Sequence, residues 1–507
     1  MLALTDVTLL YLCLAGVGVY LMKQAFAKNH APYPPGPRGL PVVGNIQDVP
    51  RVKPWLTFAE WGKKYGGISH INVLGLHIVV LNSAKTTVEM LDKKSSIYSD
   101  RPFVAMTGEL MGYGQTLPFL RYGKRFRLFR KNFHRIIGSH ASVVVYYPIE
   151  EIETHRFLKR VLANPDQLQA HVQRTACSFI LRISYGYEVK EDNDPILDIA
   201  ERALDQLSRN SLTGEFMVDF LPSLAKVPEW FPGAGFKRLA REYRETVEEV
   251  AAVTYKFAKD QMAAGTALKS FTSDLLEGRT LTAEEDHDVK WSAISLFSGG
   301  ADTSISSLYS FFLAMTLFPE VQKKAQAEID AVVGPDRLPS FTDRASLPYI
   351  DALAKEVLRW NVAIPGADHC VTEDDIHDGY YIPKGSLIVP NIWFMLNDPE
   401  TYANPSEFSP ERFLAKDGKE PETDPRAFCF GFGRRICPGV HLADASIWIS
   451  AVMSLAVLDV SKVVENGVEI TPEVDPSSGL ISHPKPFKCS IKARSDKAFA
   501  LIQQDTY

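Results

Sequence analysis

A single cysteine enclosed by glycines and arginines constrains this chain more than any other feature. Residues 430–439 read FGFGRRICPG, with Cys437 near the end of the run. Glycine allows close backbone approach and positive φ, and the two preceding arginines create a potential that favours thiolate. Pro438 and the apolar run Val440–Leu455 follow. They predict that Cys437 lies at a helix N-terminus, where N–H groups and the helix dipole stabilise an anion. Such a thiolate suits axial ligation of a redox metal.

The other cysteines and the overall composition exclude several classes of protein. Six cysteines in 507 residues, with no CxxC pair, are too few for a disulfide scaffold and favour a reducing compartment. Cys429, which adjoins the loop, is predicted to be a small buried hydrophobe like the remaining four. A content of 46% hydrophobic and 23% charged residues excludes disorder. The net charge of −6 gives no indication of nucleic-acid binding.

The N-terminus predicts a membrane anchor over residues 1–28. Val7–Met22 is uncharged and almost wholly apolar, and residues 1–6 extend it to the ~20 residues that a bilayer span needs. Lys23 and Lys28 follow the run and no basic residue precedes it, which places the C-terminal side in the cytosol. A cleaved signal peptide and a buried core helix are the alternatives. The first is disfavoured because a basic n-region and a small-x-small cleavage site are missing.

A stiff hinge and one large domain are predicted to follow the anchor. Residues 29–45 contain PPGPRGLP, in which the prolines fix φ and exclude a helix. Residues 46–507 show no further linker and no repeat, so we expect a single domain. Apolar spacing predicts helices, and alternation predicts short strands. The clearest predicted helices are Lys237–Met262, Lys290–Leu317 and Pro319–Val333, and the clearest strand regions are Gly67–Leu81 and Phe487–Ile491.

The cysteine loop resembles the haem-binding loop of the cytochrome P450 family, F-x-x-G-x-R-x-C-x-G. All five fixed positions are filled, by Phe430, Gly433, Arg435, Cys437 and Gly439. The resemblance implies haem b with Cys437 as the proximal thiolate ligand, Arg435 beside a propionate and Phe430 near the sulfur. Thiolate ligation favours O–O cleavage. The implied fold is the cytochrome P450 fold, which is mainly α with a small β subdomain, here preceded by an N-terminal transmembrane helix.

Two further motifs stand in the order that this family shows. Glu356 and Arg359 form an ExxR motif, whose i,i+3 spacing puts a carboxylate and a guanidinium on one helix face. Such spacing alone is common on surface helices. Followed by Arg412 in Pro410–Phe413, it resembles the family's Glu-Arg-Arg network. That network is expected to hold the cysteine loop in place without taking part in the chemistry.

Residues 299–304, which read GGADTS, are expected to form the oxygen side of the site. Two glycines inside a helix cost about 1 kcal/mol each relative to alanine, so the helix is predicted to be loosened there. Asp302 and Thr303 match the family's acid–alcohol pair. The resemblance implies that Thr303 hydrogen-bonds dioxygen and that Asp302 relays protons to it, with Ser304 assisting. A polar kink without chemistry is the alternative.

Two weaker matches concern the haem propionates. Tyr122–Lys131 resembles the family pattern W-x-x-x-R, with Arg130 at the arginine position and Phe126 in place of tryptophan. The neighbouring Lys124, Arg125 and Arg127 either help to dock a reductase or form a solvated face. His369 aligns with a strand position that commonly contacts a propionate, and an ordinary surface histidine is the alternative reading.

The predicted substrate-facing positions carry apolar side chains, which suits a hydrophobic small molecule. Family topology implies residues 103–117, 293–301, 362–367 and 479–482. The apolar residues in these segments are Phe103, Met106, Met111, Leu296, Phe297, Val362, Ile364, Leu480 and Ile481.

The implied activity is that of a monooxygenase that hydroxylates or otherwise oxidises a hydrophobic small molecule, such as a terpenoid or polyketide. Within the family, the chain resembles fungal microsomal enzymes of secondary metabolism, in particular over Phe318–Trp360. The implied partners are dioxygen, a membrane-bound NADPH-cytochrome P450 reductase and the membrane itself. The expected location is the endoplasmic reticulum membrane, with a single span and a cytosolic catalytic domain.

Two other activities stay open on the sequence. A haem-thiolate isomerase or dehydratase would work without dioxygen, and such enzymes usually lose the acid–alcohol pair that Asp302 and Thr303 represent here. A non-enzymatic haem sensor would need a second strong axial ligand. No His or Met stands in residues 299–304 to provide one.

Overall fold

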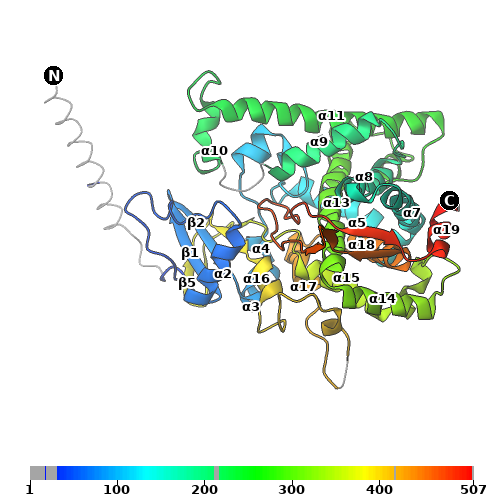
Figure 1. Ribbon diagram of the computed structural model, residues 1–507. Coiled ribbons are helices and arrows are strands. Elements are labelled where there is room, and N and C mark those ends of the chain that lie inside the picture. Colours follow the sequence, from blue (N-terminus) through cyan, green and yellow to red (C-terminus); the bar gives the residue numbers. More distant parts are fainter. Residues whose placement is uncertain (1–17, 19–30, 210–215, 416–417, 505–507) are drawn as a thin grey trace.

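One long helix, α13 (Ala283–Leu317), organises the interior of the chain (Figure 1). The computed structural model describes Gly18 and residues 31–209, 216–415 and 418–504. The Thr282 hydroxyl accepts from the Glu285 N–H, and the Glu285 carboxylate accepts from the Thr282 N–H, which caps the start of α13. From Trp291 onwards almost every side chain of α13 is buried, as expected of a helix with neighbours on all sides.

The helices of the body pack around α13. Its main partners are α8 (Leu168–Tyr185) and α18 (Val440–Val457), and α11 (Gly235–Ala264) passes over them with α9 (Pro195–Arg209). The other α-helices are α2 (Pro54–Tyr65), α3 (Ala84–Thr87), α4 (Ser95–Tyr98), α5 (Lys124–Ile137), α6 (His140–Val143), α7 (Tyr147–Ala163), α10 (Met217–Phe220), α12 (Phe271–Leu276), α14 (Pro319–Val332), α15 (Pro348–Trp360), α16 (Ile392–Asn397), α17 (Arg426–Cys429) and α19 (Asp496–Gln503).

Short π- and 3₁₀-helices connect these elements. The π-helices are η1 (Val88–Lys93) and η2 (Ala105–Leu110). The 3₁₀-helices are η3 (Tyr113–Gln115), η4 (Val144–Tyr146), η5 (Pro165–Gln167), η6 (Pro222–Lys226), η7 (Phe341–Ser346), η8 (Pro410–Phe413) and η9 (Gly433–Arg435). Several of them, notably η1, η8 and η9, position the site.

A small four-stranded sheet lies to one side of the helices (Figure 1). Its strand order is β1 (Ile68–Val73), β2 (Leu76–Leu81), β6 (Leu387–Pro390) and β3 (His369–Cys370). The β2–β6 pair is parallel and the other pairs are antiparallel. Three two-stranded pairs complete the β structure: β4 (Asp375–His377) with β5 (Tyr380–Ile382), β7 (Leu458–Ser461) with β10 (Ser490–Ala493), and β8 (Val463–Glu465) with β9 (Val468–Ile470).

The structure confirms the mainly α prediction and refines its boundaries. The three predicted helices appear as α11, α13 and α14, and Gly334 with φ 75° follows the end of α14. Gly67–Leu81 forms the hairpin β1–β2, with Leu74 and Gly75 at positive φ in its turn. The last strand begins at Ser490, three residues later than predicted. Phe487 instead packs on the ring of Tyr309 and donates its N–H to that residue's hydroxyl.

The predicted hinge is not a free spacer. Residues 31–39 lack regular structure and lie against the sheet, where the Pro35 carbonyl accepts from the N–H of His70. The Tyr33 ring stacks on His70 and His77, with centroids 4.9 and 5.0 Å away. The predicted anchor over residues 1–28 lies outside the described residues, apart from Gly18. Within the described part of the chain, α18 is long and apolar enough to cross a bilayer, but 72% of it is buried, as in a core helix.

Candidate active site

The cysteine loop is held by its backbone against η1. After α17, Gly431 and Gly433 take positive φ values of 78° and 53°, as the glycine pattern predicted. The N–H of Cys437 donates to the Phe430 carbonyl over 2.7 Å and closes the loop. A Cβ at Gly433 would overlap the carbonyl oxygen of Leu91 in η1. The loop therefore requires glycine at 433 for both its conformation and its packing.

Cys437 precedes α18, as predicted, but the local details differ. Pro438 lies outside the helix and Gly439 is its N-cap. Burial raises the pKa of the Cys437 thiol, and the Gly439 N–H and the charge of Arg130 oppose that shift. The expectation that the preceding arginines supply the positive potential is wrong. Arg434 turns outward to the Tyr122 hydroxyl, 3.1 Å away, while Arg130 approaches the loop and donates to the Ile436 carbonyl.

The Arg435 side chain packs against neighbouring groups, and one of its guanidinium nitrogens has no hydrogen-bond partner. Its guanidinium donates to the Ser99 carbonyl over 2.7 Å and to the Leu120 carbonyl over 2.8 Å. It also lies 3.9 Å from the ring centroid of Phe126, the residue that replaces the family's tryptophan. Nη1 is buried and has no hydrogen-bond partner. Burial, together with the nearby Arg101 charge, lowers the pKa of Arg435 to about 9.

His369 lies beside the same group and is buried, so the surface reading of this residue is wrong. It starts β3, and its Nδ1 donates to the Tyr98 carbonyl over 2.8 Å. Burial lowers the pKa of His369 to about 3, and the charges of Arg101 and Arg435 add to this effect. The ring is therefore neutral at pH 7.

Arg101 completes the group, and sequence reasoning missed it. Its guanidinium donates to the carbonyls of Pro118 and Asp368, next to His369. Burial lowers the pKa of Arg101 to about 10. No local motif marks this residue, since only the pairing of Asp100 with Cys370 brings it to β3. The one signal in the sequence was a basic residue two positions before the predicted substrate-facing segment at residues 103–117.

Around Gly299, α13 stays helical, so the predicted loosening is wrong. The helix assignment is unbroken from Ala283 to Leu317. Thr303 Oγ1 donates to the Gly299 carbonyl over 2.9 Å, and Ser304 Oγ donates to the Gly300 carbonyl over 2.7 Å. Gly300 permits close packing, because a Cβ there would lie 2.8 Å from Ile180 in α8. Gly299 is exposed within an otherwise buried stretch.

Asp302 is paired with a histidine that the sequence did not indicate. His483 Nε2 lies 3.1 Å from Asp302 Oδ1, while Oδ2 is buried without a hydrogen-bond partner. His483 directly follows the turn at residues 479–482 that was predicted to be apolar. That turn is fastened to α13 by the Ser306 hydroxyl, which donates to the Ser482 carbonyl. The fold thus places an ionisable side chain, His483, beside the Asp302 carboxylate of the acid–alcohol pair.

The Glu-Arg-Arg network is present as predicted. Arg359 donates to both oxygens of Glu356 over 2.8 and 2.9 Å, and both side chains are fully buried. Arg412 Nε donates to Glu356 over 3.1 Å. Paired charges with satisfied hydrogen bonds are the arrangement in which burial is tolerated. The network joins α15 to η8, and both elements precede the cysteine loop in the chain.

The remaining predicted residues divide between core and surface. Arg125 is not a free surface charge, since it pairs with Asp288 in α13 at 2.6 Å. Phe430 is half-buried, and its carbonyl accepts the hydrogen bond from Cys437 that closes the loop. Most of the predicted substrate-facing side chains are buried, and Phe297 belongs to the helical core. The ones with exposed surface are Phe103, Ile364 and Leu480.

Comparison with known proteins settles the family. The family model for Cytochrome P450 matches residues 34–491. The chain belongs to the cytochrome P450 family. Cytochrome P450 monooxygenase 208 of Postia placenta is 52% identical over 485 residues, which is 96% of this chain and 94% of that protein. Cytochrome P450 monooxygenase claR of Ampulloclitocybe clavipes is 47% identical, over 98% and 93% of the two chains.

A third cytochrome P450 relative is less similar in sequence. Cytochrome P450 monooxygenase ppsD of Aspergillus oryzae is 40% identical, over 97% of this chain and 95% of its own. The chain is therefore an oxidoreductase, a monooxygenase of a family that binds haem through a cysteine thiolate. The fold expected of this family, helical with small sheets, is the one observed.

The residues present fit a cytochrome P450 haem. Arg101, Arg130 and Arg435 are half-buried and bring positive charge together, which Asp100 offsets in part, and Arg435 Nη1 is buried without a partner. Partly buried like charges call for an anion, and haem carries two propionate carboxylates. A thiol with a raised pKa is deprotonated on binding a metal ion. Charge, donors and sulfur therefore suit the cofactor.

Proposed function

We propose that the chain oxidises a hydrophobic small molecule at a haem whose iron is bound by Cys437. The observation that carries this proposal is the half-buried Cys437 thiol in a loop closed by its own backbone, beside Arg130 and the Arg101–Arg435 group. When bound, the haem supplies the redox chemistry that activates dioxygen. Gly433 and Gly439 shape the loop, and Phe430 lies at its start.

The basic group is proposed to hold the propionates. Arg435 would offer its unpartnered Nη1, and Arg101 and Arg130 would add charge. His369 Nδ1 is occupied by a carbonyl, so its Nε2 would donate only as an imidazolium. A carboxylate beside it would raise its pKa from about 3 and favour that form.

Asp302 and Thr303 are proposed to deliver protons to the dioxygen. Thr303 Oγ1 now donates to Gly299 and would accept from water or donate to oxygen after rotation. Asp302 Oδ2 is free to take part while Oδ1 is held by His483. His483 is thus a positioning residue for the acid. An isomerase or dehydratase has no need of this arrangement.

The substrate is proposed to be an apolar secondary metabolite of the terpenoid or polyketide kind. The support is the apolar character of the segments around Phe103, Ile364 and Leu480, which keep exposed surface beside the core. Among the described residues, the neighbouring polar side chains His483 and Asp302 lie just outside these segments and are paired with each other. An apolar ligand with few polar groups fits such a lining.

Electrons are proposed to come from an NADPH-cytochrome P450 reductase that docks on α5. Lys124, Arg127 and Lys131 are exposed at helical spacing and present one basic face. Arg125, which pairs with Asp288, is excluded from this face. An acidic partner would be attracted to it.

Residues 1–28 are proposed to anchor the enzyme in the endoplasmic reticulum membrane, with residues 29–45 as the hinge and 46–507 as the cytosolic haem domain. The docking of residues 31–39 on the sheet supports a fixed exit direction for the chain. A single span with basic residues after it agrees with the positive-inside rule.

The test of the central proposal is Cys437→Ser. The haem-loaded, reduced protein should give the carbon monoxide Soret shift that marks thiolate ligation, and the serine variant should lose it, because serine offers no thiolate. Cys429→Ser is the matched control, since Cys429 is a neighbouring half-buried thiol that lies outside the family's ligand position. A shift retained in Cys437→Ser would refute the ligand assignment.

A further inference from the structure

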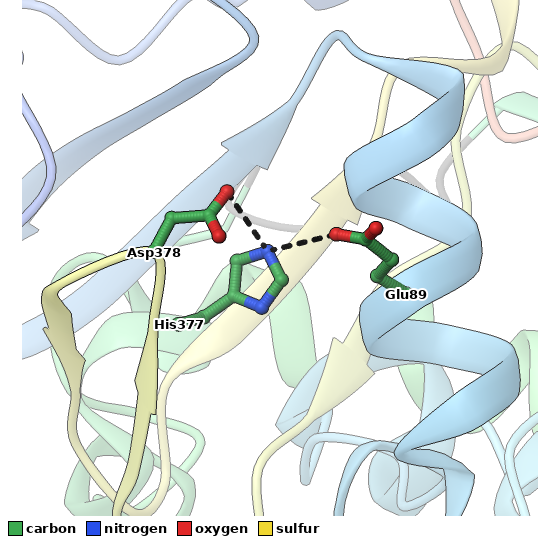
Figure 2. A group of neighbouring side chains, drawn as sticks. All are labelled: Glu89, His377 and Asp378. Carbon is green, nitrogen blue, oxygen red and sulfur yellow. Dashed lines mark ion pairs between the residues drawn. The ribbon is translucent and has the colours of Figure 1, made fainter.

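A second group of ligand-forming side chains lies away from the residues assigned above. Glu89 stands on η1, His377 ends β4, and Asp378 begins the turn to β5 (Figure 2). His377 Nε2 lies 3.9 Å from Glu89 Oε2 and 3.6 Å from Asp378 Oδ2. The three ligand atoms all lie within 4.8 Å of one another. Two elements far apart in the sequence thus contribute to one small site.

The imidazole is the part of the group that points to a ligand. The His377 side chain is only 5% exposed, and its Nε2 is buried without a hydrogen-bond partner. Figure 2 shows this nitrogen directed between the two carboxylates. Leaving a buried polar atom unpaired costs about 1–3 kcal/mol, and native structures rarely do so without a reason.

The charges around the group favour a cation. Lys94 is the nearby ammonium, and it is bound to Asp375 at 2.6 Å, where the Tyr98 hydroxyl also donates. Among the described residues, no Lys or Arg pairs with Glu89 or Asp378. With a neutral imidazole the group carries two negative charges, which one divalent ion would balance.

We propose that Glu89, His377 and Asp378 bind one Zn²⁺ ion, with water in the fourth position. Zinc binds imidazole nitrogen and carboxylate oxygen at about 2.0–2.2 Å, so two ligands of one ion lie up to roughly 4.4 Å apart. The separations of His377 Nε2 from the Glu89 and Asp378 oxygens, 3.9 and 3.6 Å, fall within that limit. Asp378 is 66% exposed, which leaves its carboxylate room to close the third side. An imidazole ligand disfavours Mg²⁺ and Ca²⁺.

The ion would fasten the β4–β5 hairpin to η1, and η1 carries the cysteine loop. Leu91, two residues after Glu89, is the residue whose carbonyl meets Gly433. Zinc at this site would therefore stabilise the support of the haem loop without touching the haem. We expect zinc to raise the unfolding temperature and to improve haem retention.

The test uses full-length, haem-loaded protein that has been treated with a chelator and then titrated with Zn²⁺ alone. We expect one tight site per chain by calorimetry and a higher unfolding temperature on zinc addition. His377→Asn and Glu89→Gln should each weaken this site more than about 100-fold, since losing an outer-shell partner alone costs 10–100-fold. The carbon monoxide spectrum reports whether each variant still folds around its haem.

Glu373→Gln is the matched control, because Glu373 is exposed just before the same hairpin and lies outside the cluster. It should bind zinc as the parent does. Equal zinc binding in His377→Asn, or no saturable site in the parent, would overturn the proposal.

Discussion

Thr303 and Ser304 show at the scale of single residues how two adjacent hydroxyls can differ in role. Both donate to a carbonyl four residues earlier, so their hydrogen bonds alone do not separate them. Their surroundings do, because Ser304 is buried whereas Thr303 keeps exposed surface above the exposed Gly299. The proposed proton delivery therefore belongs to Thr303.

Thr303→Ala should retain haem and its spectrum but release more hydrogen peroxide per NADPH consumed, because protons no longer reach the dioxygen in an ordered way. An increase of about 10-fold or more is expected from the usual 10²–10⁴-fold contribution of positioned proton transfer. Peroxide and NADPH are measured with the reductase present. Ser304→Ala serves as the control and should change the ratio little. Unchanged coupling in Thr303→Ala would contradict the assignment.

Single residues also show where prediction from sequence ends. Cys437 and its neighbours were predictable because five fixed residue types stand within ten positions of one another. Arg101 and His483 were not, because each reaches its partner through tertiary contacts that no local spacing encodes. For the same reason the sequence could not decide whether His369 is buried.

At the scale of elements, the cysteine loop depends on its packing against η1. The three helices predicted from apolar spacing match α11, α13 and α14 to within a few residues, except that α13 begins seven residues before the predicted Lys290. The loop's glycines were predicted to allow positive φ, and Gly431 and Gly433 do so. The contact between Gly433 and Leu91 could not be predicted, since η1 lies far away in the sequence.

Gly433→Ala should lower haem occupancy and the unfolding temperature, because a left-handed φ costs a non-glycine residue of order 1–3 kcal/mol and the new Cβ would collide with Leu91. Gly439→Ala is the comparison. Its φ of −94° suits any residue, and the nearest heavy atom to a Cβ there is the Cys437 sulfur at 3.8 Å. Haem content per chain and thermal unfolding measure both. Equal losses of haem content and unfolding temperature in the two variants would show that the contact of Gly433 with η1 is not the cause.

At the scale of the whole molecule, exposed apolar residues gather beside the sheet and α10. Figure 1 shows α10 on the same side as β1 and β2, and Phe220 of α10 packs against the strand cluster of Ile71, Val73, Ile78 and Leu387, as do Ile46 and Val49. The segments that contain these residues or follow them in the chain carry large exposed hydrophobic side chains: Val42, Val52, Met217, Leu221, Trp230 and Phe231. Exposed apolar patches of this kind mark interaction surfaces, and we expect this one to contact the membrane that residues 1–28 are proposed to enter.

Deleting residues 1–28 should leave partial binding to phosphatidylcholine vesicles, and adding Trp230→Ser with Phe231→Ser should remove most of it. Trp230 is 81% exposed, so the substitutions leave the core intact. Burying each aromatic side chain in lipid is worth roughly 1.5–3 kcal/mol, which predicts a loss of more than tenfold. Vesicle flotation measures binding. Full retention after all three changes would mean that another surface holds the membrane.

The half-buried arginines Arg101 and Arg435 link cofactor supply to folding. Burial and the Arg101 charge lower the pKa of Arg435, and His369 stays neutral beside them. A dianion held here, as proposed for the haem propionates, would offset this positive charge, so haem uptake would stabilise the chain by ordinary mass action. A host that makes this polypeptide faster than it makes haem would accumulate loosened, protease-sensitive protein. Yield should therefore follow haem synthesis more closely than it follows transcription.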